Sequence, residues 1–492
     1  MVNLACALSL AVASCLPLWV AAHRVTYLND DSYISLTYAK SLAQGQGFVY
    51  NHPPATLGTT TPLFTLIVAG LGVAFPSLDM AVLATAFTAL CWIGAAWCFF
   101  LFHQRLGVSV IEAWTIALCV LAFGWVDNLG MEAYLFSVLL VAAVVLHIAG
   151  RWAMTGVMVG LLFLTRGEGA MLIGVFACLH VVRCFAQRQF APKLLVGPLL
   201  RLVAGFAVPV LAWGIYAQLT FGQVLPNTLT AKMGHLRAGL GPPFVQRLFQ
   251  EWMPIWERQL RLGAAWGLNA WYVAAAMGLF VACARRQALA AFPLWGLVYT
   301  AGYSLIGVAA AGWYGLPVHF VLTILAGLGM GWLLTKLLEN RHRRVRWLTL
   351  PALAVLVLAL GCTALTRTQA VRARVGDPRG PSYTALAEWF NANADPTESI
   401  AYVEIGYLGF FTENRIIDLL GLTLPDVATH VAQGDLIWGL RRYRPDYVVY
   451  LPEFDWLMGD LVTDGTFQSA YEHVAELRGP GEGNLVIYKR AS

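Results

Sequence analysis

Long apolar runs separated by short polar segments fill the first three quarters of the chain. About eleven runs have the length that a helix needs to cross the hydrocarbon core of a bilayer. They lie at residues 3–22, 79–102, 108–126, 132–149, 152–165, 168–186, 199–219, 265–284, 289–311, 316–337 and 347–366. A further run at 62–75 is too short to cross unaided, so we expect a re-entrant or interfacial helix there. The pattern predicts a multi-span α-helical membrane domain over residues 1–366.

Beyond Arg367 the pattern changes, because apolar runs become short and alternate with Gly, Pro and Asp. Such short runs bounded by turn residues predict strands, here at 399–403, 415–419, 447–451 and 485–488. Helical periodicity recurs at 383–393 and 435–443. We therefore expect residues 367–492 to form a soluble α/β domain.

Basic residues set the orientation. If the N-terminus is inside, the short loops around Arg105, Arg151, Arg188 and Arg286 and the segment after Lys336 face the cytoplasm. Basic short loops are typical of that side. The opposite loops, including 221–263 and the soluble domain, are richer in acids, Gly and aromatic residues, so we expect them outside.

Composition agrees with this class. The 492 residues are 59% hydrophobic and 12% charged, with a net charge of +5. Because the basic residues lie between apolar runs, they indicate topology and no nucleic-acid partner. The nine cysteines lie in or beside apolar runs without metal-binding or CxxC spacing, so we expect neither a zinc site nor a disulfide framework.

One external segment has an amphipathic pattern. Its apolar residues recur at spacings of three and four, at Phe244, Leu248, Trp252, Ile255 and Trp256. This pattern predicts either a helix lying flat in the headgroup region or a helix packed against the bundle.

The first candidate for chemistry is the acidic pair Asp30 and Asp31, directly after the first apolar run. Ionisable residues at a membrane surface are functional candidates. Tyr33, Leu36 and Tyr38 continue on a helical period, so we expect an interfacial helix that fixes the height of the acids. A solvated acidic loop is the alternative.

Other polar residues are predicted on the same side of the membrane. They are Glu132 in NLGMEAY, Arg166 and Glu168 in LTRGEGA, Asn227 and Lys232 in FGQVLPNTLTAK, and Trp313 and Tyr314 in AGWYGLP. Each has an ordinary alternative, since buried charges pair with one another and aromatic residues form interface belts. Together they indicate a cavity for an anionic headgroup and a polar ring.

These segments resemble the GT-C glycosyltransferases, which use polyprenyl-phosphate sugars. The ordered set DDSYISLTYAKSLAQGQGFVYN, LGTTTPLFTL, GMEAYLF, LTRGEG, FGQVLPNTLTAK and VEIGYLGFFTENRIIDLLGLTLPD looks like the branch that contains the terminal arabinofuranosyltransferase of actinobacterial cell walls. The resemblance covers most of the chain. This chain has Gly167 where the family often has Pro, which bears on the donor sugar.

The resemblance implies an inverting transfer of arabinofuranose, or another pentose or hexose such as mannose, from a polyprenyl phosphate to an extracytoplasmic glycan, lipid or protein. It implies Asp30 as general base, with Asp31 as second choice or orienting partner, and Arg166 and Lys232 as the cations for the phosphate. Sugar or lipid contacts would come from Glu132, Glu168, Tyr38, Asn227, Trp313 and Tyr314.

The resemblance requires no cofactor, although Asp30, Asp31 and Glu132 are an alternative divalent-cation set. It implies a monomer in a bacterial inner membrane with its active site on the periplasmic side, and we expect the soluble domain to help hold the acceptor.

Two other classes are alternatives. A transporter or flippase also has many spans and intramembrane charges, but it would show inverted repeats and broken helices near the midplane. A non-catalytic glycan-binding scaffold would not depend on Asp30.

Overall fold

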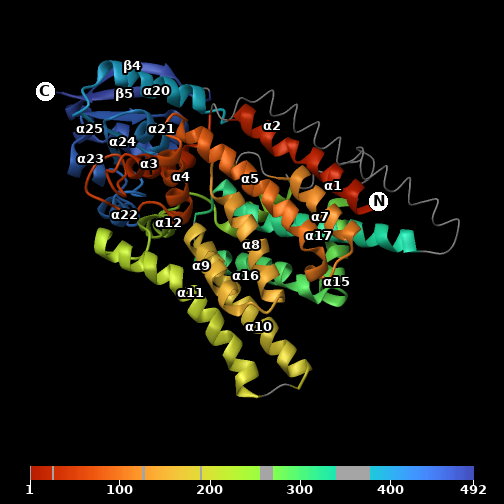
Figure 1. Cartoon of the computed structure of the whole chain (residues 1–492). Helices are drawn as coiled ribbons and strands as arrows, with labels where there is room; N and C mark the ends of the chain where they lie inside the picture. Colours follow the sequence, from red (N-terminus) through yellow and green to blue (C-terminus); the bar gives the residue numbers. More distant parts are fainter. Residues whose placement is uncertain are drawn as a thin grey trace.

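The computed structural model describes residues 2–24, 27–124, 128–188, 191–254, 270–307, 309–339, 377–481 and 483–491. A bundle of long helices forms most of the molecule, and a small sheet domain from the C-terminal part of the chain lies at one end of it (Figure 1). The span predicted at 347–366 lies outside the described residues.

Every predicted span up to residue 337 contains an apolar helix. The bundle consists of α1 (Val2–Ala13), α2 (Cys15–Arg24), α5 (Met80–Leu101), α6 (His103–Leu106), α7 (Val110–Ala122), α8 (Ala133–Ile148), α9 (Trp152–Thr165), α10 (Met171–Ala186), α11 (Pro192–Phe221), α15 (Ala270–Ala284), α16 (Ala291–Ile306) and α17 (Leu316–Glu339). Six helical segments within the described ranges are long and apolar enough to cross a membrane, and the other apolar helices are shorter.

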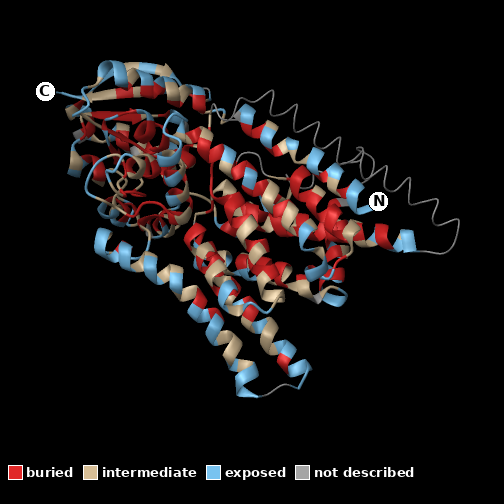
Figure 2. Ribbon diagram, in the orientation of Figure 1, coloured by how far each residue is buried: buried red, intermediate tan, exposed pale blue. Residues whose placement is uncertain are grey.

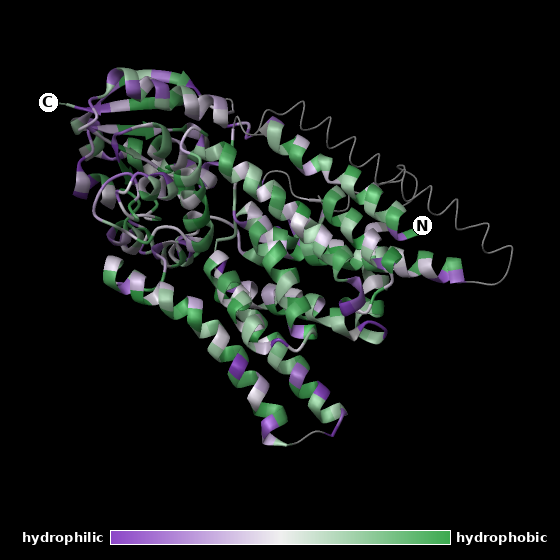
Figure 3. Ribbon diagram, in the orientation of Figure 1, coloured by the Kyte–Doolittle hydropathy of each residue, from purple (hydrophilic) through white to green (hydrophobic). Residues whose placement is uncertain are grey.

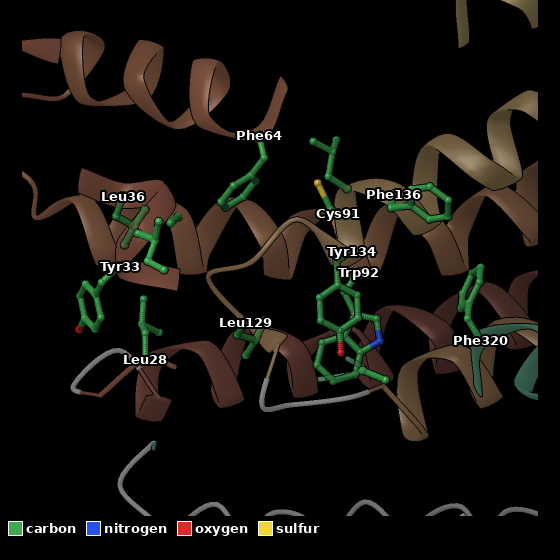
Figure 4. Packing of buried hydrophobic residues seen from close by; sticks show 14 of the residues in the cluster. Leu28, Tyr33, Leu36, Phe64, Cys91, Trp92, Leu129, Tyr134, Phe136 and Phe320 are labelled. Atoms are coloured by element: carbon green, nitrogen blue, oxygen red, sulfur yellow. The ribbon is translucent and has the colours of Figure 1, made fainter. Parts of the chain in front are cut away.

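Buried residues concentrate where these helices face one another, and apolar residues cover much of the outer surface (Figures 2 and 3). Helices approach closely at small residues, which is how membrane helices pack: a Cβ on Gly327 of α17 would lie 2.6 Å from the Cα of Ile116 in α7. Between α5 and α8 the rings of Trp92 and Tyr134 stack with centroids 4.9 Å apart (Figure 4). On α11, Leu219 is 83% exposed, as expected for a side chain that faces lipid.

Two helices from the loop between the first two predicted spans lie at the end of the bundle that carries the sheet domain (Figure 1). Helix α3 (Asp30–Ala43) begins at the acidic pair, where the Asn29 side chain accepts a hydrogen bond from the Asp31 amide. Helix α4 (Pro62–Ala74) has 13 residues and is therefore about 20 Å long, shorter than the hydrocarbon core. Helices are thus present at both places where the sequence predicted them.

The long segment after α11 contains α12 (Asn227–Arg237), α13 (Phe244–Arg247) and a π-helical turn, Leu248–Trp252. Phe244, Leu248 and Trp252 are all buried. The ring of Phe244 lies 5.5 Å from that of Tyr303 in α16. The segment thus packs against the bundle up to residue 254, while Ile255 and Trp256 lie outside the described residues.

The sheet domain has five strands in the order β2-β1-β3-β5-β4. They are β1 (Ser399–Tyr402), β2 (Arg415–Asp418), β3 (Tyr447–Tyr450), β4 (Tyr471–Arg478) and β5 (Asn484–Arg490). Strand β1 pairs in parallel with β2 and β3, whereas β5 pairs antiparallel with β3 and β4. The helices are α20 (Gly380–Asn393), α21 (Gly406–Phe411), α22 (Pro425–Val431), α23 (Trp438–Tyr443), α24 (Asp455–Thr463) and α25 (Gly465–Ala470).

The strands predicted from the sequence are present, and β4 is the one that was not predicted. Most of its side chains are exposed, because it forms one edge of the sheet, so its sequence YEHVAELR lacks an apolar run.

Candidate active site

A cavity of about 320 Å³ lies at the end of the bundle next to the sheet domain. Its walls come from the start of α4, the turn between α9 and α10, the loop after α11, α12, α16 and the residues before α17. Polar and aromatic lining residues are Glu132, Arg166, Glu168, Lys232, Tyr303, Trp313 and Tyr314. Apolar lining residues include Phe163, Leu164, Met171, Trp213, Leu225 and Leu229. Six of the predicted site residues therefore come together.

Arg166 is the centre of a buried ion-pair network in this cavity. It follows the end of α9 in an extended conformation, and the 3-10 turn Gly167–Ala170 carries Glu168 back beside it. The Arg166 Nη1 lies 2.9 Å from Glu132 Oε1, and its Nε lies 2.5 Å from Glu168 Oε1. The Tyr303 hydroxyl donates to Glu168 Oε2 at 3.1 Å. Two carboxylates thus offset one guanidinium, and removing any member would leave a buried charge unpaired.

Lys232 presents the second cation of the cavity from α12. Its Nζ lies 5.1 Å from the centroid of the Trp313 ring and 5.3 Å from that of Tyr314, which are cation–π distances. Burial lowers the pKa of Lys232, but Tyr314 and the charge of Asp31 raise it more, so the net pKa lies above its ordinary value. The ammonium is therefore charged at neutral pH.

The acidic pair is divided between two roles. Asp30 is 3% exposed, and its carboxylate accepts hydrogen bonds from the Gly406 and Tyr407 amides at 2.9 and 3.0 Å. These amides begin α21, so Asp30 holds the sheet domain onto α3. Asp31 is half-buried; burial raises its pKa, while the charges of Lys232 and Arg379 lower it. Neither acid is among the residues that line the cavity, but Asp31 is electrostatically linked to it through Lys232.

Two further predicted site residues lie away from the cavity. The Tyr38 hydroxyl donates to the Thr56 carbonyl at 2.8 Å and accepts from the Gly58 amide at 3.0 Å. The side-chain amide of Asn227 donates through its Nδ2 to the Gly421 carbonyl at 2.6 Å. Tyr38 therefore fixes the loop before α4, and Asn227 ties the start of α12 to the sheet domain.

Of the three carboxylates in the alternative cation set, Glu132 pairs with Arg166 and Asp30 accepts two backbone amides. Within the described ranges there is no group of three or more His, Cys, Asp or Glu side chains that could hold a metal ion.

Three residues beside these groups were not predicted. They are Tyr303, Arg379 and Glu404. Tyr303 donates a hydrogen bond to Glu168. Arg379 lies between two carboxylates, with its Nη2 2.8 Å from Asp377 Oδ2 and its Nη1 2.9 Å from Glu404 Oε1. Burial and the charge of Asp30 raise the pKa of Glu404 well above its ordinary value. One feature of the sequence could have identified Glu404: it directly follows the predicted strand at 399–403, and ligands bind at the carboxyl ends of parallel strands.

The fold is similar to that of known structures. ArnT from Cupriavidus metallidurans bound to undecaprenyl phosphate has a TM-score of 0.58 and 15% identity, over 99% of this chain and 98% of that one. The same enzyme in the apo state has a TM-score of 0.57 and 13% identity, over 98% and 97%. This chain therefore has an ArnT-like fold, and within the described residues it has six helical segments long and apolar enough to cross a membrane.

Residues 367–488 match a family model described as "Domain of unknown function (DUF8728)". This match has nearly the bounds of the predicted soluble domain. No curated protein matches the chain significantly in sequence.

Proposed function

We propose that this chain is an inverting glycosyltransferase that moves a sugar from a polyprenyl phosphate to a glycan, glycolipid or protein at the periplasmic face of a bacterial inner membrane. The observation that carries the proposal is the cavity itself, which combines a cation, aromatic rings and an apolar wall beside a half-buried carboxylate. The ArnT structure with undecaprenyl phosphate supports the same class, because this chain shares that fold.

The donor phosphate is best placed at Lys232. The charge of Arg166 is already offset by Glu132 and Glu168, whereas Lys232 lies over two aromatic rings. A fixed cation there would stabilise the charge that develops on the departing phosphate, and such preorganised charges often lower the barrier more than any other single effect in an enzyme. The prenyl chain would follow the apolar wall formed by Trp213, Leu225 and Leu229.

The geometry favours Asp31 over Asp30 as the general base. Both oxygens of Asp30 accept backbone hydrogen bonds, so this side chain is committed to positioning. Asp31 would take the proton of the acceptor hydroxyl while that oxygen attacks the anomeric carbon and the bond from this carbon to the phosphate oxygen breaks. The products are the new glycoside, protonated Asp31 and polyprenyl phosphate. A positioned base contributes roughly a hundred- to ten-thousand-fold in rate.

The sugar would stack against Trp313 and Tyr314, within reach of Glu132 and Glu168. Arabinofuranose is the first candidate because of the sequence resemblance, and mannose or another pentose or hexose is the alternative.

The test is transfer by purified full-length protein from a panel of polyprenyl-phosphate sugars to a crude envelope glycan. The variants are Asp31→Asn, Asp30→Asn and Lys232→Gln, with Asp426→Asn, an exposed aspartate of α22, as the matched control. We expect wild type and Asp426→Asn to consume one donor, Asp31→Asn to bind that donor but to lose at least a hundredfold in turnover, and Lys232→Gln to bind it weakly.

If Asp31→Asn is fully active and Asp30→Asn loses its activity, the general base is Asp30 and not Asp31. If wild type consumes no donor, the glycosyltransferase proposal fails. Movement of labelled lipid across vesicles without transfer would then indicate a flippase, and glycan binding alone would indicate a scaffold.

A further inference from the structure

The sheet domain is docked directly onto the helix that carries the acidic pair. The Tyr407 hydroxyl donates to the Leu28 carbonyl at 2.7 Å. Leu28 lies shortly before Asp30, whose carboxylate accepts hydrogen bonds from the Gly406 and Tyr407 amides. The Asp377 amide donates to the Tyr27 carbonyl at 2.9 Å. Two separate segments of the domain, one before α20 and one after β1, therefore meet at the start of α3.

Arg379 connects these two segments. Its Nη1 pairs with Glu404 after β1, and its Nε and Nη2 lie 3.1 and 2.8 Å from the two oxygens of Asp377 before α20. This fork geometry fixes the guanidinium in space, because arginine presents its donors in one rigid plane. The charge of Arg379 also acts on Asp30 and Asp31.

We propose that Arg379 is a positioning residue of the active site: the sheet domain fixes its guanidinium beside the start of α3, where the positive charge favours the ionised form of Asp31, the form that can accept the proton of the acceptor. This inference rests on the proposed function, and it gives the domain a part in catalysis in addition to any part in holding the acceptor.

The charges around Asp31 explain why a cation is needed. Within the described residues, the groups that act on Asp31 are Asp30 on its own helix, Lys232 on α12, Arg379 and Asp377 beside the start of α20, and Glu404 after β1. The carboxyls outnumber the cations. Burial and the charge of Asp30 raise the pKa of Glu404 well above its ordinary value.

Asp31 is the acid on which both cations act. Burial raises the pKa of Asp31 above its ordinary value, and the charges of Lys232 and Arg379 offset only part of that rise. Lys232 is also the proposed phosphate ligand, so its charge is shared with the donor when the donor binds. Arg379 is paired only with residues of its own domain in the described structure, and it remains as the constant counter-charge for the base.

The experiment compares wild type, Arg379→Gln and Arg379→Lys in the full-length protein. The control is Arg441→Gln, which removes an arginine of the same domain that pairs with Asp435 instead. The measurement is kcat/KM for transfer as a function of pH. A base works only when it is deprotonated, and loss of the positive charge should raise the pKa of Asp31. The acidic limb of the pH profile of kcat/KM should therefore move to higher pH, by about one unit for a nearby charge.

We expect Arg379→Gln to show that displacement and to recover at high pH, with the KM for the donor unchanged. Arg379→Lys should lie close to wild type, and Arg441→Gln should match it. A merely structural role would instead lower turnover equally at every pH, and an active Arg379→Gln enzyme with an unmoved limb would overturn the inference.

A second readout does not depend on turnover. Hydrophobic carbodiimides react with protonated carboxyls, so the modification of Asp31, quantified by peptide mass spectrometry, follows its protonation without any donor. Modification of Asp31 should begin at higher pH in Arg379→Gln than in wild type, and an identical onset would contradict the inference. If wild type consumes no donor, the proposed function fails, and the labelling still decides whether Arg379 controls the proton on Asp31.

Discussion

The contact between Gly406 and Asp30 allows a direct test of how the sheet domain is held. A Cβ added at Gly406 would lie 1.9 Å from the backbone oxygen of Asp30 and 2.9 Å from its Cγ. Since real Cβ contacts essentially never fall below 3.0 Å, Gly406→Ala must push α21 away from α3 by more than 1 Å. The hydrogen bonds from Gly406 and Tyr407 to Asp30, at 2.9 and 3.0 Å, would then be broken.

The cost follows from two effects. Overpacking costs about 1 to 3 kcal/mol, and each hydrogen bond to a charged group contributes about 1.5 to 3 kcal/mol. We therefore expect the docked arrangement to lose at least about 4 kcal/mol, the sum of the lower bounds, which corresponds to a thousandfold or more in its equilibrium. Amides of α3 and α21 should exchange with deuterium faster by that order, as measured by hydrogen-exchange mass spectrometry.

Gly465→Ala is the control, because its Cβ would meet nothing within 4 Å and it lies in the same domain. It should leave exchange in α3 and α21 unchanged. Exchange in Gly406→Ala within tenfold of wild type would refute the reasoning, since it would mean that the domain can move aside without losing its hydrogen bonds to Asp30.

Three further predictions concern the cavity and α12. Arg166→Met should lower the free energy of unfolding by about 3 to 5 kcal/mol, because the two carboxylates around it stay buried without a counter-charge; thermal unfolding in detergent measures this, and Lys336→Met, at an exposed pair, should cost under about 1 kcal/mol. Trp313→Ala should weaken donor binding about fivefold to thirtyfold, by loss of a stacking and cation–π surface, and unchanged affinity in a binding titration would place the donor elsewhere. Burial lowers the pKa of His235, so the folded state binds fewer protons there than the unfolded state. Stability should fall as pH drops below about 6.5, and His235→Gln should flatten that fall in a series of melting curves.

Apolar length and turn residues were enough to predict the bundle and most of the sheet. The predicted strand at 415–419 corresponds to β2, and the short run at 62–75 to α4, because burial of a continuous face leaves a local pattern in the sequence. The edge strand β4 leaves no such pattern, since its side chains are mostly exposed. The alternative of a flat surface helix at 244–256 could not be decided from periodicity, because a packed helix and an interfacial helix share the same spacing.

The site shows the same division between local and long-range information. The sequence placed Arg166 and Lys232 together because both follow ends of apolar runs on one side of the membrane, and the cavity contains both. It could not show that Asp30 and Asp31 have different contacts, because the partners of Asp30 are amides more than 370 positions later in the chain. Arg379 was missed for the same reason.

The position of those partners has a consequence for the making of the protein. Synthesis proceeds from the N-terminus, so α3 is made long before β1 and α21. Until then Asp30 has no amides to bind and Asp31 lacks the charge of Arg379. A chain that stops short of the sheet domain would therefore lack the amides that hold Asp30 in place.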